Sequence, residues 1–267
     1  MNGMPSHKTS NGRFVEVHDN LKLNEVKDFH TRMYEKYRSV HGLTNSFDDR
    51  TLRAPYIRRL IRKHFPPNRE AKILDLGCGS GTLLHFLREA GYGYVSGVDT
   101  SPEQVAAAQR SGIHSVRQGN LLDVLRHIET RELDVVVTFD VIEHMTKPEL
   151  LELSDEVYRV LQKGGKWLIH APNAGGLFGS RVRYADLTHE QAFTRESLEQ
   201  LLTAVGFEKI ECYEDQPVIH GLMSGTRWLV WKIVRALLRV CWVAETGSIG
   251  KDCVFSQNLI AVGHKLS

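Results

Sequence analysis

Short apolar runs alternate with amphipathic stretches along residues 71–212, and this alternation dominates the hydrophobic pattern of the chain. The stretches between the apolar runs have helical periodicity. The runs themselves predict six strands, near 72–76, 94–99, 114–118, 134–139, 165–171 and 207–213. Strands that alternate with helices are typical of a doubly wound, mostly parallel sheet, whose ligand crevice lies at the carboxyl ends of the strands. We therefore expect an α/β domain with its site at that edge.

The pattern changes on both sides of this region. The first twenty or so residues have little periodicity and are expected to be mobile, whereas residues 24–41 and 50–64 predict two helices. An apolar run within 252–264 predicts a final strand. These observations divide the chain into an N-terminal segment with a helical cap over 1–65 and a single larger domain over 66–267.

A helical insertion is expected over 215–250, before the final strand, and its segment 228–243 is rich in tryptophan and basic residues. On a helix, Lys232, Arg235 and Arg239 fall within an arc of about 60°, opposite an apolar face. The segment is too short and too charged to span a bilayer. An interfacial helix on an anionic membrane has this pattern, but the pattern favours somewhat more an apolar face that covers the active site of the chain or a second subunit.

Composition indicates which partners are disfavoured for this protein and in which compartment we expect it. The chain has 34 basic and 32 acidic residues, a net charge of +2, so its overall charge does not favour nucleic acid as a partner. The four cysteines form no C-x-x-C pair and predict free thiols in a reducing compartment. The N-terminus has no apolar segment typical of a signal peptide. We expect a cytoplasmic protein that the helical insertion could hold at the inner face of a membrane.

A glycine-rich loop follows the first predicted strand of the domain. Gly77, Gly79 and Gly81 stand at alternate positions between this strand and a helix, with the acid Asp75 before them. Glycines here let the backbone turn tightly and approach a ligand closely. A dinucleotide-binding fingerprint would need a glycine at Thr82, so the loop does not fit that class. The spacing favours a different nucleotide-like cofactor.

Asp99 marks the end of the second predicted strand. Its carboxylate could accept two hydrogen bonds from the hydroxyls of a ribose. The alternative is that Asp99 caps the next helix, but Ser101 followed by Pro102 is the better start for that helix. We therefore expect the Asp99 carboxylate to be available to a ligand.

The acid followed by G-x-G-x-G resembles the first motif of class I S-adenosylmethionine (SAM)-dependent methyltransferases. In that family the loop curls round the amino-acid end of SAM, and segments matching Gly119 to Asp123 form an adenine-binding turn. Asn120 stands where the family usually has an acid, although its carbonyl could still accept from the adenine amino group. The resemblance implies SAM as cofactor and implies the following binding residues: Asp75, Gly77, Cys78, Gly79, Gly81, Asp99, Thr100, Asn120, Leu121 and Phe139.

Two further pairs narrow the subtype. Glu143-His144 follows the fourth strand and Pro172-Asn173 follows the fifth, as in the ubiquinone-pathway O-methyltransferases and related sugar and small-metabolite enzymes. The resemblance covers about residues 30–212, and it implies a Rossmann-like methyltransferase fold with seven strands, the last antiparallel. It also implies transfer to oxygen on a small-molecule, sugar or lipid-linked acceptor.

His144 and His189 are the candidate general bases, because both lie on segments expected to border the methyl group of SAM and both can titrate near neutral pH. Each could instead be a structural histidine. Asp140, Glu143 and His144 also form a D-x-x-E-H pattern that could hold a magnesium ion. Adjacent residues on a helix point in different directions, so we expect no metal.

Three other functions are less well supported. Nucleic-acid methylation is disfavoured, because the chain lacks an N/D-P-P-Y/F pattern after the fourth strand and a Pro-Cys nucleophile. A SAM-binding subunit without catalysis would keep the same cofactor residues, so only turnover separates it from an enzyme. A methyltransferase acting on nitrogen or carbon of a small metabolite is the remaining alternative.

Overall fold

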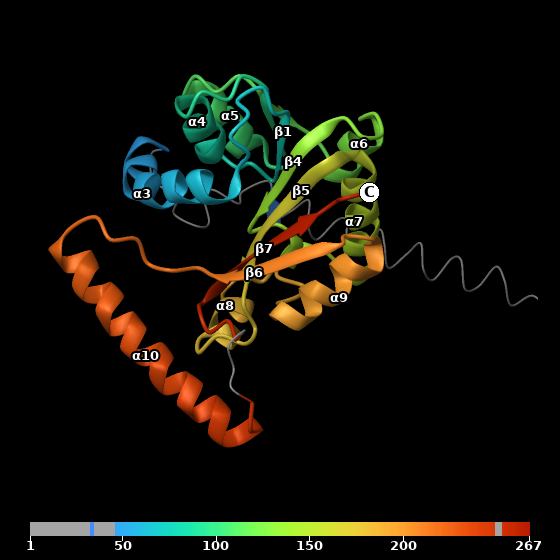
Figure 1. Ribbon diagram of the computed structural model, residues 1–267. Coiled ribbons are helices and arrows are strands. Elements are labelled where there is room, and N and C mark those ends of the chain that lie inside the picture. The colour runs from blue at the N-terminus through green and yellow to red at the C-terminus, as the bar shows by residue number, and fades with distance from the viewer. Residues whose placement is uncertain (1–32, 35–45, 249–252) are drawn as a thin grey trace, which may run out of the picture.

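The computed structural model describes residues 33–34, 46–248 and 253–267, and a seven-stranded sheet forms its centre (Figure 1). The strand order is β3-β2-β1-β4-β5-β7-β6, and only β7 runs antiparallel to its neighbours. The strands are β1 (Ile73–Leu76), β2 (Val95–Asp99), β3 (Val116–Gln118), β4 (Leu133–Phe139), β5 (Leu161–Pro172), β6 (Lys209–Glu214) and β7 (Asn258–His264). The predicted doubly wound sheet with an antiparallel last strand is confirmed.

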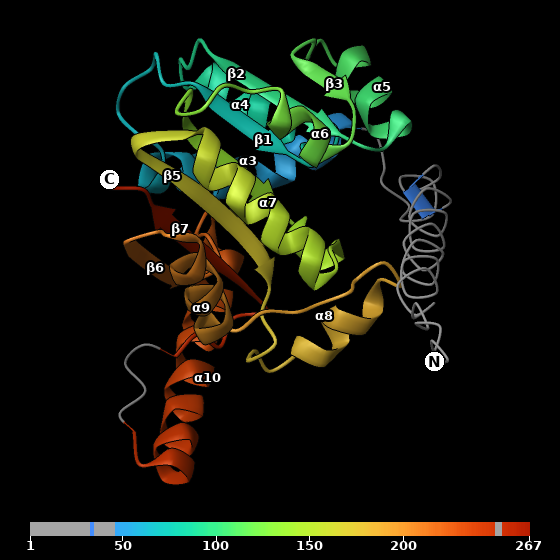
Figure 2. The same cartoon turned by 90° about the vertical axis from the view of Figure 1, so that its right-hand side faces the viewer.

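Helices cover both faces of the sheet, as Figures 1 and 2 show. One face packs against α3 (Ser46–His64), α4 (Thr82–Glu89) and α5 (Pro102–Arg110). The other face packs against α6 (Leu121–Arg126), α7 (Lys147–Val160) and α9 (Arg195–Val205). A short 3-10 helix (Ile142–His144), α8 (Gly179–Ala185) and α10 (Leu222–Thr246) lie outside these layers.

Local sequence explains several of the helix ends. Ser101 caps α5 by accepting from the Gln104 amide, with Pro102 in the first turn, as predicted. Gly206 ends α9 with φ at 115°, and the next residue, Phe207, is buried. β5 begins at Leu161, four residues before the predicted start, because it already pairs with Leu133 of β4 there. The predicted helix over 24–41 lies almost entirely outside the described residues.

The four cysteines are free thiols in different surroundings. Cys78 is buried in the glycine-rich loop, Cys212 and Cys253 are half-buried, and Cys241 is exposed on α10. Burial raises the pKa of Cys212 to about 12 and raises that of Cys78 further. Cys241 is therefore the most accessible thiol of the four.

α10 projects away from the sheet (Figure 1), and its orientation corrects two expectations. Arg235 does not belong to an exposed basic stripe, because it is buried against Glu214 of β6. Most of the apolar face does not cover the active site within the described residues, since Ile233 and Leu237 are more than half exposed, whereas Val230 lines a cavity between α10 and the body of the domain. Within the described residues, no helix is long and apolar enough to cross a membrane.

Candidate functional site

The glycine-rich loop runs from β1 into α4 with a left-handed backbone at each glycine. Gly77 has φ of 72°, and a Cβ atom there would lie 2.3 Å from Cγ2 of Val141. Gly79 has φ of 53°, but a Cβ atom there would meet nothing closer than 3.9 Å. Packing inside the protein therefore explains the glycine at 77. At 79 the backbone conformation explains it, and the space beside it is open to a ligand.

Asp75 and Asp99 lie at the ends of the neighbouring strands β1 and β2. Asp75 is buried, and its Oδ1 has no hydrogen-bond partner among the described residues. Burial, reinforced by the charge of Asp99, raises the pKa of Asp75 to about 8. A buried carboxyl without a partner fits a ligand that brings a positive group to this point.

Asp99 is less available than the sequence indicated. Its Oδ2 accepts from the Gly79 amide (2.7 Å) and its Oδ1 accepts from the Ser101 amide (2.8 Å). Burial raises the pKa of Asp99, and these two bonds oppose that rise. Because a carboxylate has about four acceptor positions, each oxygen can still receive one hydroxyl of a ribose.

The remaining predicted cofactor residues follow β2, β3 and β4. Asn120 is the N-cap of α6, and its Oδ1 accepts from the amides of Leu122 (2.9 Å) and Asp123 (3.3 Å). The Asn120 carbonyl thus already serves the helix, which the sequence interpretation did not foresee. Leu121 is buried directly after it and Thr100 is exposed directly after Asp99. Phe139 is half-buried at the end of β4.

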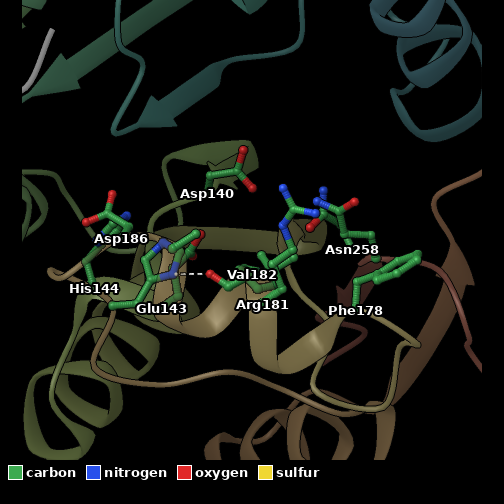
Figure 3. Close-up of a pocket in the computed structure, with 12 residues that line it drawn as sticks. Asp140, Glu143, His144, Phe178, Arg181, Val182, Asp186 and Asn258 are labelled. Carbon is green, nitrogen blue, oxygen red and sulfur yellow. Dashed lines mark hydrogen bonds between the residues drawn. The ribbon is translucent and has the colours of Figure 1, made fainter. Parts of the chain in front are cut away.

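A cavity of about 640 Å³ lies beside the carboxyl ends of β4 and β5 (Figure 3). Residues from the turn after β4, from α8 and from the start of β7 form its wall. Those with polar or aromatic side chains include Asp140, Glu143, His144, Phe178, Arg181, Asp186, His189, Gln257 and Asn258. A second cavity of about 600 Å³ lies between α10 and the body of the domain, and it shares Phe178, Gln257 and Asn258 with the first.

The two candidate bases meet in the first cavity, with ring centroids 4.7 Å apart. Nδ1 of His189 lies 3.1 Å from the Val182 carbonyl oxygen, which can only accept, so Nδ1 carries the proton (Figure 3). The lone pair of neutral His189 is therefore on Nε2. A neutral imidazole held by a carbonyl in this way is oriented as a general base.

A hydrogen-bond chain fixes the tautomer of His144 as well. The Thr188 hydroxyl donates to Oδ1 of Asp186 (2.6 Å), so its oxygen accepts from Nδ1 of His144 (2.9 Å). The bonds from Thr188 hold the pKa of Asp186 low in spite of its partial burial. Burial, with the nearby His189, lowers the pKa of His144 to about 4, so this ring is neutral at pH 7.

The structure brings together a different metal-ligand set from the one that the sequence suggested. The set consists of Glu143, His144 and His189. Each offers one ligand atom, and these three atoms lie within 4.8 Å of one another. Asp140 is not part of this set, because its Oδ1 contacts Nδ1 of His170 at 2.6 Å. Burial and the charge of Asp140 raise the pKa of Glu143 well above its usual range. A cation at this point would have to displace the proton of Glu143.

His170 lies behind the cavity wall, in contact with Asp140, and sequence reasoning did not single it out. It is buried between Asp140 and Asp215, with Nε2 lying 3.4 Å from Oδ2 of Asp215, and it stacks on Phe139 at a centroid distance of 4.0 Å. Burial opposes the charged form, but the two carboxylates outweigh it and raise the pKa of His170 to about 10. The buried histidine therefore carries a positive charge at neutral pH. Its partners are 30 and 45 residues away, so no local motif could reveal them.

A mostly parallel sheet with a glycine-rich loop after β1 and an acid at the end of β2 is typical of the Rossmann-like methyltransferase class. A family model described as a methyltransferase domain matches residues 49–212, more than half of the chain. The chain belongs to this family, and its domain is of the class I SAM-dependent methyltransferase type.

Curated relatives agree with this class. A probable SAM-dependent methyltransferase of Mycolicibacterium smegmatis is 30% identical over 137 residues, covering 51% of this chain and 51% of the relative. The mitochondrial ubiquinone biosynthesis O-methyltransferase of Candida albicans is 30% identical over 179 residues, covering 61% and 50%. The chain thus spans about half the length of the curated relatives it matches.

Solved structures share the fold. A SAM-dependent methyltransferase from Archaeoglobus fulgidus superposes with a TM-score of 0.60 at 20% identity, covering 79% of this chain and 93% of that one. Phosphoethanolamine N-methyltransferase 2 of Haemonchus contortus, solved with SAM, gives a TM-score of 0.55 at 21% identity, covering 79% and 52%. SAM is the cofactor of the family to which the chain belongs.

Proposed function

We propose that this enzyme transfers the methyl group of SAM to an oxygen of a small-molecule acceptor, with His189 as the general base. The observation that carries the proposal is the tautomer of His189, whose Nδ1 is held by the Val182 carbonyl so that Nε2 has the lone pair. The similarity to ubiquinone biosynthesis O-methyltransferases supports oxygen as the acceptor atom.

In this proposal the loop from Asp75 to Gly81 holds the amino-acid end of SAM. The partnerless Oδ1 of Asp75 and the open space beside Gly79 support that assignment. Asp99 would accept from the ribose hydroxyls, and the segment around Asn120 and Leu121 would lie against the adenine. When bound, SAM supplies a methyl group on a positively charged sulfur that is already activated toward nucleophiles.

The protein then has to position the acceptor, exclude water and remove one proton. A hydroxyl group in the first cavity would give its proton to Nε2 of His189 as the oxygen attacks. His144 would support this step as a neutral neighbour, held by Thr188 and Asp186. An imidazolium at His189 would find a stabilising carboxylate nearby, since the pKa of Asp186 is held low.

We infer the chemical class of the acceptor from the residues that line the two cavities. The first cavity offers polar groups from Asp140, Arg181 and Asn258, which suit a diol, a catechol or a sugar. The second cavity adjoins it and is lined by the apolar side chains of Val230, Trp231 and Leu238 on α10. An acceptor with a hydroxylated head and an apolar tail, such as a lipid-linked sugar or quinone precursor, would fill both.

Incubation of the purified protein with methyl-labelled SAM and a cell extract tests the proposal. We expect label in the lipid or polar small-molecule fraction and, by mass spectrometry, on oxygen. Label on nitrogen or carbon, or label in protein or nucleic acid, would contradict the proposed acceptor. Repeating the assay with a chelator asks whether Glu143, His144 and His189 act together through a cation, because activity would then be lost and return with added metal.

Substitution of the base gives a sharper test. We expect His189→Ala to lower kcat by roughly 100-fold to 10,000-fold, as for other general bases, while the Kd for SAM stays unchanged. His114→Ala is a matched control, because His114 is exposed before β3, at the opposite end of the sheet from the ligand crevice. Equal losses of turnover and of SAM affinity would assign His189 a structural role instead.

A further inference from the structure

The outer face of α10 is an apolar strip that runs the length of the helix. At about 1.5 Å per residue, the 25 residues of α10 extend for about 37 Å. The exposed fractions are large along the whole strip, from 93% at Leu222 near one end to 68% at Val240 near the other. Between these lie Leu229, Ile233 and Leu237, each between 54% and 61% exposed. An apolar surface of this extent marks a contact with something outside the described chain.

The polar contacts of α10 fix which face points outward. Nε of Arg235 donates to both carboxylate oxygens of Glu214, at 3.1 and 3.0 Å, and its guanidinium lies 3.7 Å from the ring centroid of Trp231. Glu214 is also held by the Phe255 amide at 2.8 Å. Breaking this buried ion pair would leave an uncompensated charge, so the helix cannot roll to hide its apolar strip.

The exposed charges of α10 lie along the two edges of the strip. At about 100° per residue, Lys232 and Arg239 stand about 100° to 120° from the direction of Ile233 on one side, and Arg227 stands about 120° away on the other. All three are exposed. The only acidic residue of α10 is Glu245, in its last turn. The strip is therefore bordered by positive charge on both edges.

The positive charge along both edges indicates which kind of partner covers the apolar strip. If two copies of the chain paired through the strip, cations at the edges of one helix would face cations at the edges of the other, in a parallel or an antiparallel arrangement. Like charges placed opposite one another destabilise a pairing. An anionic bilayer accepts both features at once, because the apolar strip enters the acyl boundary while the basic edges remain at the lipid headgroups.

We propose that α10 docks this methyltransferase on the surface of an anionic membrane, with the strip from Leu222 to Val240 in the interface and Arg227, Lys232 and Arg239 against the headgroups. The docking does not depend on which atom the enzyme methylates. It needs only the orientation of α10, which the Arg235–Glu214 pair sets.

Co-sedimentation of the full-length protein with vesicles, without SAM or acceptor, tests the proposal. We expect the protein to bind vesicles that contain phosphatidylglycerol, to bind vesicles of phosphatidylcholine alone much less, and to dissociate as salt is raised. Lys232→Gln with Arg239→Gln should weaken binding roughly 30-fold, because each basic residue near the surface contributes about a factor of five.

Leu237→Asp removes an apolar anchor and should abolish sedimentation with the vesicles. Leu151→Asp is its matched control, since Leu151 is also an exposed leucine of a helix, 48% exposed on α7. Both variants change exposed positions, so both should keep the melting temperature and SAM affinity of the parent protein. A labelling assay in which the parent protein transfers no methyl group to oxygen would overturn the proposed function. It would not change the expected vesicle binding, so failure of the proposed function and failure of the docking can be told apart.

Three results would overturn the docking. The first is a parent protein that does not sediment with phosphatidylglycerol vesicles. The second is a Leu237→Asp variant that binds them as well as the parent does. The third is a dimer in sedimentation velocity that Leu237→Asp dissociates, because the strip would then be the interface between two copies of the chain.

Discussion

Two neighbouring acidic side chains, Asp75 and Asp99, differ in what the protein already does with them. Both carboxylate oxygens of Asp99 hold backbone amides, one at Gly79 in the glycine-rich loop and one at Ser101, the N-cap of α5. Asp75 has an oxygen with no partner among the described residues. Asp99 therefore shapes the loop as well as offering acceptor positions, whereas Asp75 is poised for a ligand.

Asp99→Asn should raise the Kd for SAM by about 10-fold to 100-fold while the protein stays folded. The amide keeps the shape of the side chain but gives up the charge that strengthens bonds from ribose hydroxyls, and its NH2 group can no longer accept one of the two backbone bonds from Gly79 and Ser101. A hydrogen bond to a charged group contributes about 1.5–3 kcal/mol. Calorimetric titration with SAM measures the effect. Asp155→Asn on the exposed surface of α7 should change nothing, and an unchanged Kd for Asp99→Asn would remove Asp99 from the ribose site.

Asp75 should lose its proton when SAM binds. With a pKa of about 8 it is mostly protonated at pH 7, and a bound ammonium group beside it would favour the carboxylate. We therefore expect the release of nearly one proton per SAM at pH 7. The binding enthalpy measured in buffers of different ionisation enthalpy reports this release. Asp75→Asn should show no buffer dependence, and a parent protein without buffer dependence would contradict the contact.

At the scale of elements, the loop between β1 and α4 depends on the residue that packs against it. Gly77→Ala combines a left-handed backbone, which costs about 1–2 kcal/mol, with an overlap against Val141 that costs about 1–3 kcal/mol. Val141→Ala should relieve only the overlap. Urea unfolding of the single and double variants should therefore give a coupling energy of about 1–3 kcal/mol.

Gly79→Ala is the matched comparison in the same loop. The added Cβ atom has open space, so Gly79→Ala should lower the free energy of unfolding only by the cost of the left-handed backbone. The variant should show no coupling to Val141→Ala. Additive effects for Gly77→Ala and Val141→Ala would mean that the loop moves away from Val141, and the close approach would then not explain the glycine.

The elements themselves were largely predictable from the sequence. β1, β2 and β4 are short buried runs, and their ends coincide with Asp75, Asp99 and Phe139 to within a residue or two. The orientation of α10 was not predictable, because it depends on Glu214, a residue of β6 that pairs with Arg235 only in the folded protein. A helical wheel finds the apolar face of a helix, but the buried partner of its polar face decides which side meets the sheet.

The residues of the candidate site were also only partly predictable from the sequence. The predicted cofactor residues fall in short segments at the ends of strands and carry motifs, so the sequence alone could suggest them. The histidine cluster depends on contacts over long sequence separations, such as Thr188 with His144, and on a backbone carbonyl at Val182 that no residue type reveals. The pair His144 and His189 could be proposed, but their tautomers and the exclusion of Asp140 from the metal-ligand set needed the structure.

At the scale of the whole molecule, buried ionisable groups make stability depend on pH. His170 has a folded-state pKa of about 10, above its unfolded value, so its stabilisation is complete below about pH 6.5 and is lost as pH rises through 10. The raised pKa of Asp75 acts in the same direction between about pH 4 and 8. His64 and His144, each lowered by burial to about 4, destabilise the protein as pH falls from 6.5.

The free energy of unfolding should therefore fall as pH rises from about 6.5 toward 10, where the raised pKa values of Asp75 and His170 act together. Each additional proton that the folded state binds contributes a slope of about 1.4 kcal/mol per pH unit. Urea unfolding from pH 5 to 10 measures the profile. His170→Gln should be less stable at pH 6.5 but should lose much of the decline between pH 7 and 10. A parent profile that rises on the alkaline side would show that His170 is neutral in the folded protein.

The exposed thiol on α10 gives the chain a natural attachment point for a probe. Cys241 is exposed, while Cys78 and Cys212 have pKa values raised by burial and react more slowly through their scarcer thiolates. A thiol-reactive fluorophore would therefore mark α10 in the unmodified protein in preference to Cys78 and Cys212. Its emission colour would report the polarity around α10 and would follow the arrival of the enzyme at a lipid surface in real time.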